Sequence, residues 1–88
     1  MKLTVIGRYG PYAKGGGATS CYLVEEKNTR IVLDMGAGTL SRLLSRVDIR
    51  DIDAIFISHL HYDHTSDLLP LRYLLDEVGV PITIYTNY

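Results

Sequence analysis

Five short segments combine apolar residues, β-branched residues and polar alternation in the manner of β-strands. They span residues 2–6, 20–25, 30–33, 54–57 and 82–86. Residues 26–29 (Glu-Lys-Asn-Thr) are polar and suit a hairpin turn between the second and third segments. The first 34 residues therefore predict a β-meander. Residues 54–57 (Ala-Ile-Phe-Ile) form a continuous apolar run, which is typical of a strand buried on both faces.

Two later segments change to the 3.6-residue period of an amphipathic helix. The first has Thr39 as its expected N-cap, and its apolar stripe is Leu40, Leu43, Leu44 and Val47. The second spans residues 66–78, with Pro70 in its first turn, Gly79 at its end, and an apolar stripe of Leu68, Leu71, Leu75 and Val78. The predicted order is β-β-β-α-β-α-β, an α/β (α+β) arrangement with the helices on one face of a sheet.

Composition narrows the class of protein. The chain has 88 residues, and 9 Lys and Arg against 10 Asp and Glu give a net charge of −1. This length allows one small domain or part of a larger one. The near-neutral charge excludes a strongly basic nucleic-acid-binding surface over the whole chain, though not a local one, and 47% hydrophobic residues argue against disorder. Apolar runs are far shorter than the ~20 residues of a membrane helix, and we expect neither a membrane segment nor a targeting segment.

Cys21 is the single cysteine, so an internal disulfide and a cysteine-based zinc site are both excluded. We expect a small buried side chain in a reducing, cytoplasmic setting. Gly15-Gly16-Gly17 lacks the Lys-Ser/Thr ending of a phosphate-binding loop and is interpreted as a flexible turn.

All three histidines lie within the six residues His59-Leu60-His61-Tyr62-Asp63-His64, between a predicted strand and a predicted helix. In an extended segment, His59 and His61 point to the same side, and a following turn would bring Asp63 and His64 into the same pocket. Imidazole nitrogens and carboxylate oxygens are zinc ligands. A solvated polar loop is the alternative, but the spacing and position favour a metal site.

This segment resembles the His-x-His-x-Asp-His signature of the metallo-β-lactamase-fold hydrolases. Ile31-Val32-Leu33-Asp34-Met35-Gly36 resembles the strand-ending Asp-x-Gly of that superfamily, and residues 15–23 resemble the glycine-rich entry to the second strand in its ribonuclease Z-like branch. The resemblance implies a four-layered αβ/βα sandwich, of which residues 1–88 would be a single partial domain, the N-terminal half.

The resemblance also implies a set of metal ligands. His59 and His61 would bind one metal, and Asp63 and His64 the second. Asp34 would hydrogen-bond the ligand loop, and the less favoured alternative is a turn and capping residue. The remaining ligands of the family, two histidines and a bridging aspartate, lie downstream. We therefore expect the missing C-terminal half, or a second chain, to complete the site.

The expected function is a hydrolase with two zinc ions, although manganese and iron also suit these ligands. Asp63 would be the catalytic residue, orienting the attacking water or taking its proton. Phosphodiester substrates, small or nucleic acid, are favoured over esters, thioesters or lactones. We expect the 88-residue piece alone to be inactive. The other alternative is a non-catalytic half-domain that self-associates, and an exposed sheet edge predicts a homo-oligomer.

Overall fold

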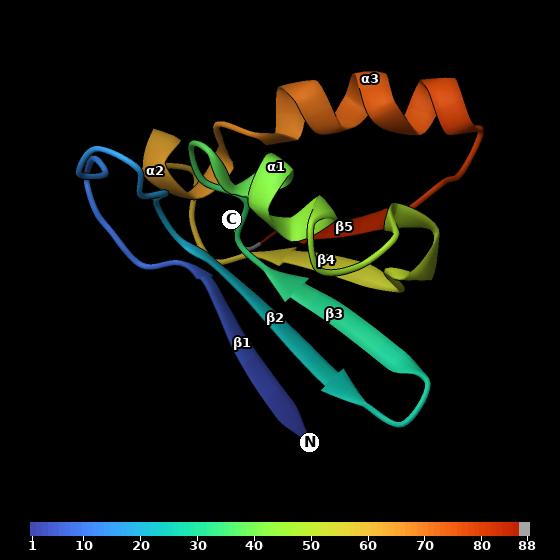
Figure 1. Ribbon diagram of the computed structural model, residues 1–88. Helices are drawn as coiled ribbons and strands as arrows, with labels where there is room; N and C mark the ends of the chain where they lie inside the picture. Colours follow the sequence, from blue (N-terminus) through green and yellow to red (C-terminus); the bar gives the residue numbers. More distant parts are fainter. Residues whose placement is uncertain (87–88) are drawn as a thin grey trace.

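The computed structural model describes residues 1–86, and in it five strands form one sheet in the order β1-β2-β3-β4-β5 (Figure 1). The strands are β1 (Lys2–Gly7), β2 (Cys21–Glu26), β3 (Thr29–Leu33), β4 (Ala54–Ile57) and β5 (Thr83–Thr86). The first three strands are antiparallel, and β3, β4 and β5 are parallel to one another. The predicted β-meander is confirmed, and the fold is the mixed α/β arrangement that the sequence predicts.

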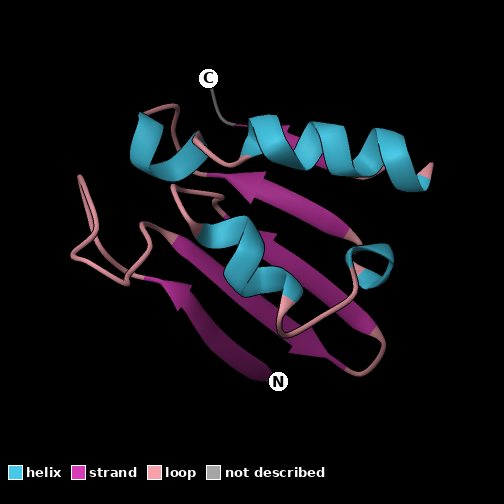
Figure 2. Cartoon of the chain, turned by 45° about the horizontal axis from the view of Figure 1, so that its top comes forward, coloured by secondary structure: helices cyan, strands magenta, loops and turns pink. Residues whose placement is uncertain are grey.

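Two helices connect the parallel strands and cover one face of the sheet (Figure 2). The first is α1 (Thr39–Leu44), between β3 and β4, and the second is α3 (Leu68–Val78), between β4 and β5. Two neighbouring parallel strands require such a crossover connection, because the end of the first strand and the start of the second lie at opposite ends of the strands. Two short elements were not predicted: the 3₁₀ helix η1 (Ile49–Asp51) and the helix α2 (Tyr62–Thr65).

The predicted starts of the two helices each need a correction. Gly38, at φ 81°, is the N-cap of α1, and Thr39 is the first helical residue, whose hydroxyl donates to the Gly36 carbonyl at 2.7 Å. Asp67, which is distant in the sequence, caps this helix instead: its carboxylate accepts a hydrogen bond from the Leu40 amide at 2.7 Å. The second helix begins at Leu68 rather than at residue 66. Pro70 lies in its first turn, as predicted.

The core lies between the helices and one face of the sheet. It is centred on side chains from three neighbouring strands, Leu23, Val32 and Ile55, together with Leu43 of α1 and Leu71 of α3. Leu23 pairs with Val32, and Val32 pairs with Ile55, so these three side chains point to the same face. The apolar stripes predicted for the two helices therefore lie on the core, except for Leu44, which is 39% exposed.

The other face of the sheet is open, which makes the prediction of a fully buried β4 wrong. Phe56 is 41% exposed there and stacks on Tyr85 of β5, with 4.8 Å between the ring centroids. Together with Tyr22 and Leu33, these rings line a hollow of about 370 Å³. A continuous apolar run of four residues does not reveal which of its faces is covered. Within residues 1–86, none of the helices has the length and apolar character needed to cross a membrane.

Candidate metal centre

The candidate site lies where β3 and β4 end. These strands are parallel, so Asp34, directly after β3, and Ser58, directly after β4, reach the same edge of the sheet. The Asp34 amide donates to the Phe56 carbonyl at 2.8 Å, which extends the pairing by one residue. Asp34 has a φ of 66°, the left-handed region that aspartate tolerates better than most residues. The sheet therefore fixes the position of both side chains.

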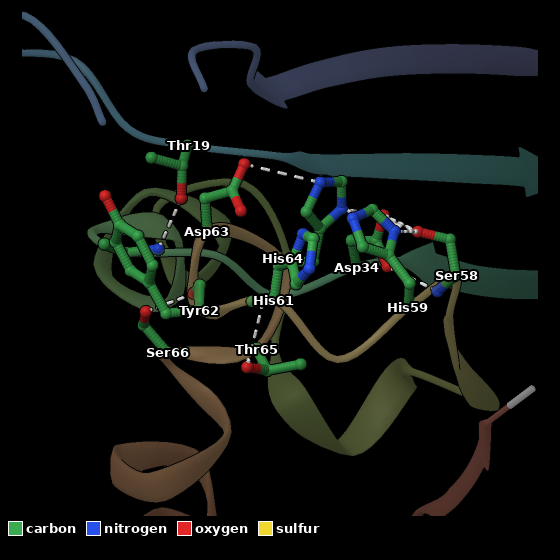
Figure 3. A network of polar contacts seen from close by, with 11 residues as sticks. Thr19, Asp34, Ser58, His59, His61, Tyr62, Asp63, His64, Thr65 and Ser66 are labelled. Atoms are coloured by element: carbon green, nitrogen blue, oxygen red, sulfur yellow. Dashed lines mark hydrogen bonds and ion pairs between the residues drawn. The ribbon is translucent and has the colours of Figure 1, made fainter. Parts of the chain in front are cut away.

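The Asp34 carboxylate holds the beginning and the end of the histidine segment together (Figure 3). Its Oδ1 accepts a hydrogen bond from the Ser58 amide at 2.7 Å, and its Oδ2 accepts one from the Ser58 hydroxyl at 2.8 Å. The same Oδ2 lies 2.7 Å from Nδ1 of His64. Asp34 is buried, and these three partners compensate for the loss of water around its charge.

The three imidazole rings are gathered at this edge (Figure 3). The centroid of the His59 ring lies 4.9 Å from that of His61 and 3.9 Å from that of His64. On the other side of His64, its Nε2 lies 3.4 Å from Oδ2 of Asp63. The structure thus brings together His59, His61, Asp63, His64 and Asp34, all of the site residues that the sequence singles out.

Helix α2 explains how neighbouring residues reach the same place. The chain is extended at His61, with ψ 149°, and then turns into α2, which places Asp63 and His64 back against the sheet edge. Backbone bonds hold this turn: the Ser20 amide donates to the Asp63 carbonyl at 3.2 Å, and the Met35 amide donates to the His64 carbonyl at 2.9 Å. The turn that the sequence predicts after His61 is therefore a short helix, which begins at Tyr62.

The donor set fits a divalent metal ion, because it consists of two pairs of neighbouring donors, His59 with His61 and Asp63 with His64. Two ligands about 2.0–2.2 Å from one tetrahedral ion lie roughly 3.3–3.6 Å apart. The 3.4 Å between His64 Nε2 and Asp63 Oδ2 falls in that range. Within residues 1–86, however, no group of three or more His, Cys, Asp and Glu side chains is arranged so that it could hold one metal ion. The four predicted ligands are therefore arranged as adjacent pairs rather than as one closed arc.

Gly36 is the point where three segments of the site meet most tightly. A Cβ atom at this position would collide with the Thr19 hydroxyl and the Asp63 carbonyl oxygen, and it would lie 2.9 Å from the Ser20 amide nitrogen. We expect Gly36→Ala to lower the free energy of unfolding by about 1–3 kcal/mol, because a backbone must move to admit the methyl group. Urea denaturation measures the change.

Gly15→Ala is the matched control for this substitution. A Cβ at position 15 would meet nothing within 4 Å, so we expect a change of no more than about 0.5 kcal/mol. Equal unfolding midpoints for the two variants would show that the site tolerates a side chain at position 36.

Cys21 is fully buried on β2 and takes no part in the site. Burial is the main cause that raises the pKa of its thiol from 9.0 to about 12; a hydrogen bond with Thr39 lowers this pKa in part, and the negative charges of Asp34 and Asp67 add to the rise. The thiol is thus protonated at neutral pH and is no nucleophile.

Two residues of the site escaped the sequence analysis. Ser58 directly precedes the histidine segment and was not predicted as a site residue, yet its hydroxyl contacts Asp34 and the Nδ1 atoms of two histidines. The only available signal was its position directly after a buried strand. Gly36 was seen as part of an Asp-x-Gly triplet, but its contacts with Thr19 and Asp63 depend on tertiary packing.

Known proteins are similar to this chain in sequence. The probable metallo-hydrolase YhfI of Bacillus subtilis is 40% identical over 73 residues, which are 83% of this chain and 30% of the relative. The ribonuclease Z of Methanopyrus kandleri is 42% identical over 55 residues, 61% of this chain and 20% of that protein. The chain thus spans less than a third of the length of these relatives.

Solved structures also resemble this chain. The crystal structure of the metallo-beta-lactamase fold protein YhfI superposes with a TM-score of 0.94 and 34% identity, over 97% of this chain and 35% of that one. The short form of human tRNase Z shares the fold, with a TM-score of 0.71 at 19% identity, over 98% of this chain and 44% of that one. The family model of the metallo-beta-lactamase superfamily matches residues 15–87. The chain belongs to the metallo-beta-lactamase superfamily.

Proposed function

We propose that the full-length protein is a metal-dependent hydrolase that uses two zinc ions and acts on phosphodiesters. The observation that carries the proposal is the chain of contacts Asp34–His64–Asp63, in which a buried carboxylate holds one nitrogen of an imidazole while the other nitrogen faces a second carboxylate at 3.4 Å. Carboxylate–histidine pairs of this kind orient metal ligands in proteins. The superfamily membership and the ribonuclease Z relatives support the same function.

The four predicted ligands would bind two ions, two ligands to each. His59 and His61, adjacent at the end of β4, would hold one ion, and Asp63 and His64, on α2, the other. Bound divalent cations supply Lewis acidity toward the substrate and make water a stronger acid. Asp63 is buried beside Gly10, whose missing side chain leaves room for its carboxylate. We assign Asp63 the additional role of orienting the attacking water and accepting its proton.

The C-terminal half of the sandwich, or a second chain, would supply the remaining ligands. A catalytic zinc site has three protein ligands, so two ions need about six ligand contacts, and residues 59–64 offer four. The 88-residue chain alone would then be inactive. The open sheet face with Phe56 and Tyr85 is apolar enough to favour self-association, and the homo-oligomer stays a prediction, as does the cytoplasmic location.

Substrate class is tested by assaying the full-length protein, loaded with zinc and separately with manganese, on a p-nitrophenyl phosphodiester, a thioester and a lactone. We expect the phosphodiester to give the highest kcat/KM, and a chelator to abolish turnover. Turnover confined to the thioester or the lactone would contradict the substrate class but keep the hydrolase. Elemental analysis showing no bound metal, together with no turnover of any substrate, would contradict the proposed function and favour a non-catalytic module.

A further inference from the structure

The Ser58 hydroxyl lies between the buried carboxylate and two of the histidines. Its Oγ is 2.8 Å from Oδ2 of Asp34, 3.0 Å from Nδ1 of His59 and 3.4 Å from Nδ1 of His64. The Ser58 amide donates to the other oxygen of Asp34, so serine and aspartate are joined by two hydrogen bonds (Figure 3). This double attachment fixes the hydroxyl oxygen relative to the imidazoles.

A count of protons assigns a direction to each of these contacts. A hydroxyl has one proton to donate and two lone pairs, whereas an ionised carboxylate only accepts. The proton of Ser58 therefore goes to Asp34, and the hydroxyl oxygen is left to accept from His59. His59 must then carry its proton on Nδ1, which leaves a lone pair on Nε2.

The same carboxylate acts on His64 directly. Nδ1 of His64 lies 2.7 Å from Oδ2 of Asp34 and donates to it, which leaves a lone pair on Nε2. That Nε2 faces Asp63 at 3.4 Å. Asp34 thus sets the tautomer of His64 without an intermediary, and it reaches His59 only through the serine hydroxyl.

We propose that Ser58 is a positioning residue, which relays the charge of Asp34 to His59 and keeps the Nε2 atom of His59 free to bind a metal ion. The inference rests on the proposed metal-binding function. Its physical basis is that a hydrogen-bonded partner on one imidazole nitrogen fixes the ring and raises the basicity of the other nitrogen. Loss of such a partner lowers metal affinity by about 10- to 100-fold.

The tautomers are tested by nitrogen NMR of the metal-free, full-length protein with 15N-labelled histidine, in which protonated and unprotonated ring nitrogens resonate far apart. Signals of His59 and His64 are assigned by their loss in His59→Gln and His64→Gln. In the wild type we expect both rings to be protonated on Nδ1. In Ser58→Ala we expect His59 to move toward the Nε2-protonated form, while His64, bonded directly to Asp34, keeps its tautomer.

The same variants are then titrated with zinc in competition with a chelator. We expect Ser58→Ala to weaken zinc binding by about 10-fold or more, and Ser58→Thr to restore both the affinity and the tautomer, because it retains the hydroxyl. Ser45→Ala is the matched control, since its exposed hydroxyl bonds only the Arg42 carbonyl at the end of α1. We expect it to equal the wild type.

The outcomes separate the relay from the proposed function. A wild-type His59 protonated on Nε2, or a Ser58→Ala protein with unchanged tautomer and unchanged zinc affinity, would overturn the relay even if zinc binds normally. A wild-type protein that binds no zinc would contradict the proposed function instead. The tautomer measurement, made without metal, would still decide whether Ser58 controls His59.

Discussion

Replacing His59 and His61 together with alanine is expected to remove at least one of about two bound metal ions and to lower hydrolysis by about a thousandfold or more. The two rings are edge-to-face neighbours, 4.9 Å apart between centroids, at the exposed end of β4. Their loss leaves His64 and Asp63 in place but removes the pair proposed to hold one ion. Elemental analysis of the purified full-length protein and turnover of a phosphodiester measure the two effects.

Leu60→Ala is the matched control for the double variant. Leu60 stands between the two histidines and is 59% exposed, so its truncation disturbs the same segment without removing a ligand. We expect its metal content to equal that of the wild type. A double variant that keeps the full metal content would exclude His59 and His61 as ligands and contradict the proposed arrangement.

Asp63→Asn is expected to lower kcat by about 10²–10⁴-fold while the fold is retained. Asparagine matches aspartate in shape, so the buried pocket beside Gly10 and His64 stays filled, but the group that would take a proton from water is lost. Asp63→Ala is expected to reduce turnover at least as strongly. Steady-state kinetics measure kcat, and circular dichroism with urea denaturation checks the fold.

Asp51→Asn serves as the control for charge loss. Asp51 is exposed on η1, just before β4 begins, whereas the site lies where β4 ends. We expect its kcat to match the wild type. An Asp63→Asn protein with wild-type kcat would remove Asp63 from the mechanism, and metal content would then show whether it remains a ligand.

Most of the fold follows from local pattern. Alternating strands around residues 26–29 specify the hairpin, and two apolar stripes at helical spacing specify α1 and α3. The failures have physical causes. The apolar stripe predicts a helix that reaches Val47, whereas α1 ends at Leu44. The stripe continues past the helix because the Val47 amide still donates to the Leu43 carbonyl and the Val47 side chain still packs on the core. Helix α2 has four residues and no apolar period, since Asp63 and His64 occupy it.

The site was predictable to the extent that its chemistry is concentrated in the sequence. Three histidines and an aspartate within six residues identify the candidate ligands without a structure. Ser58 could not be found in the same way, because a single hydroxyl has no pattern, and its role depends on which partners share its one proton. The same holds for Gly36, whose importance comes from atoms of residues 19 and 63 that only the folded chain brings near.

The site is held in place by the main-chain pairing of β3 and β4, and this has a consequence for how the sequence can diverge. Asp34 and Ser58 are placed by the parallel register of β3 and β4, in which Leu33 pairs with Phe56, and not by the identity of the strand side chains. Those side chains can therefore change without moving the site, as long as the core positions such as Val32 and Ile55 stay apolar and the strands keep their alignment. Homologues with few shared residues should still present the carboxylate, the hydroxyl and the imidazoles in the same mutual positions.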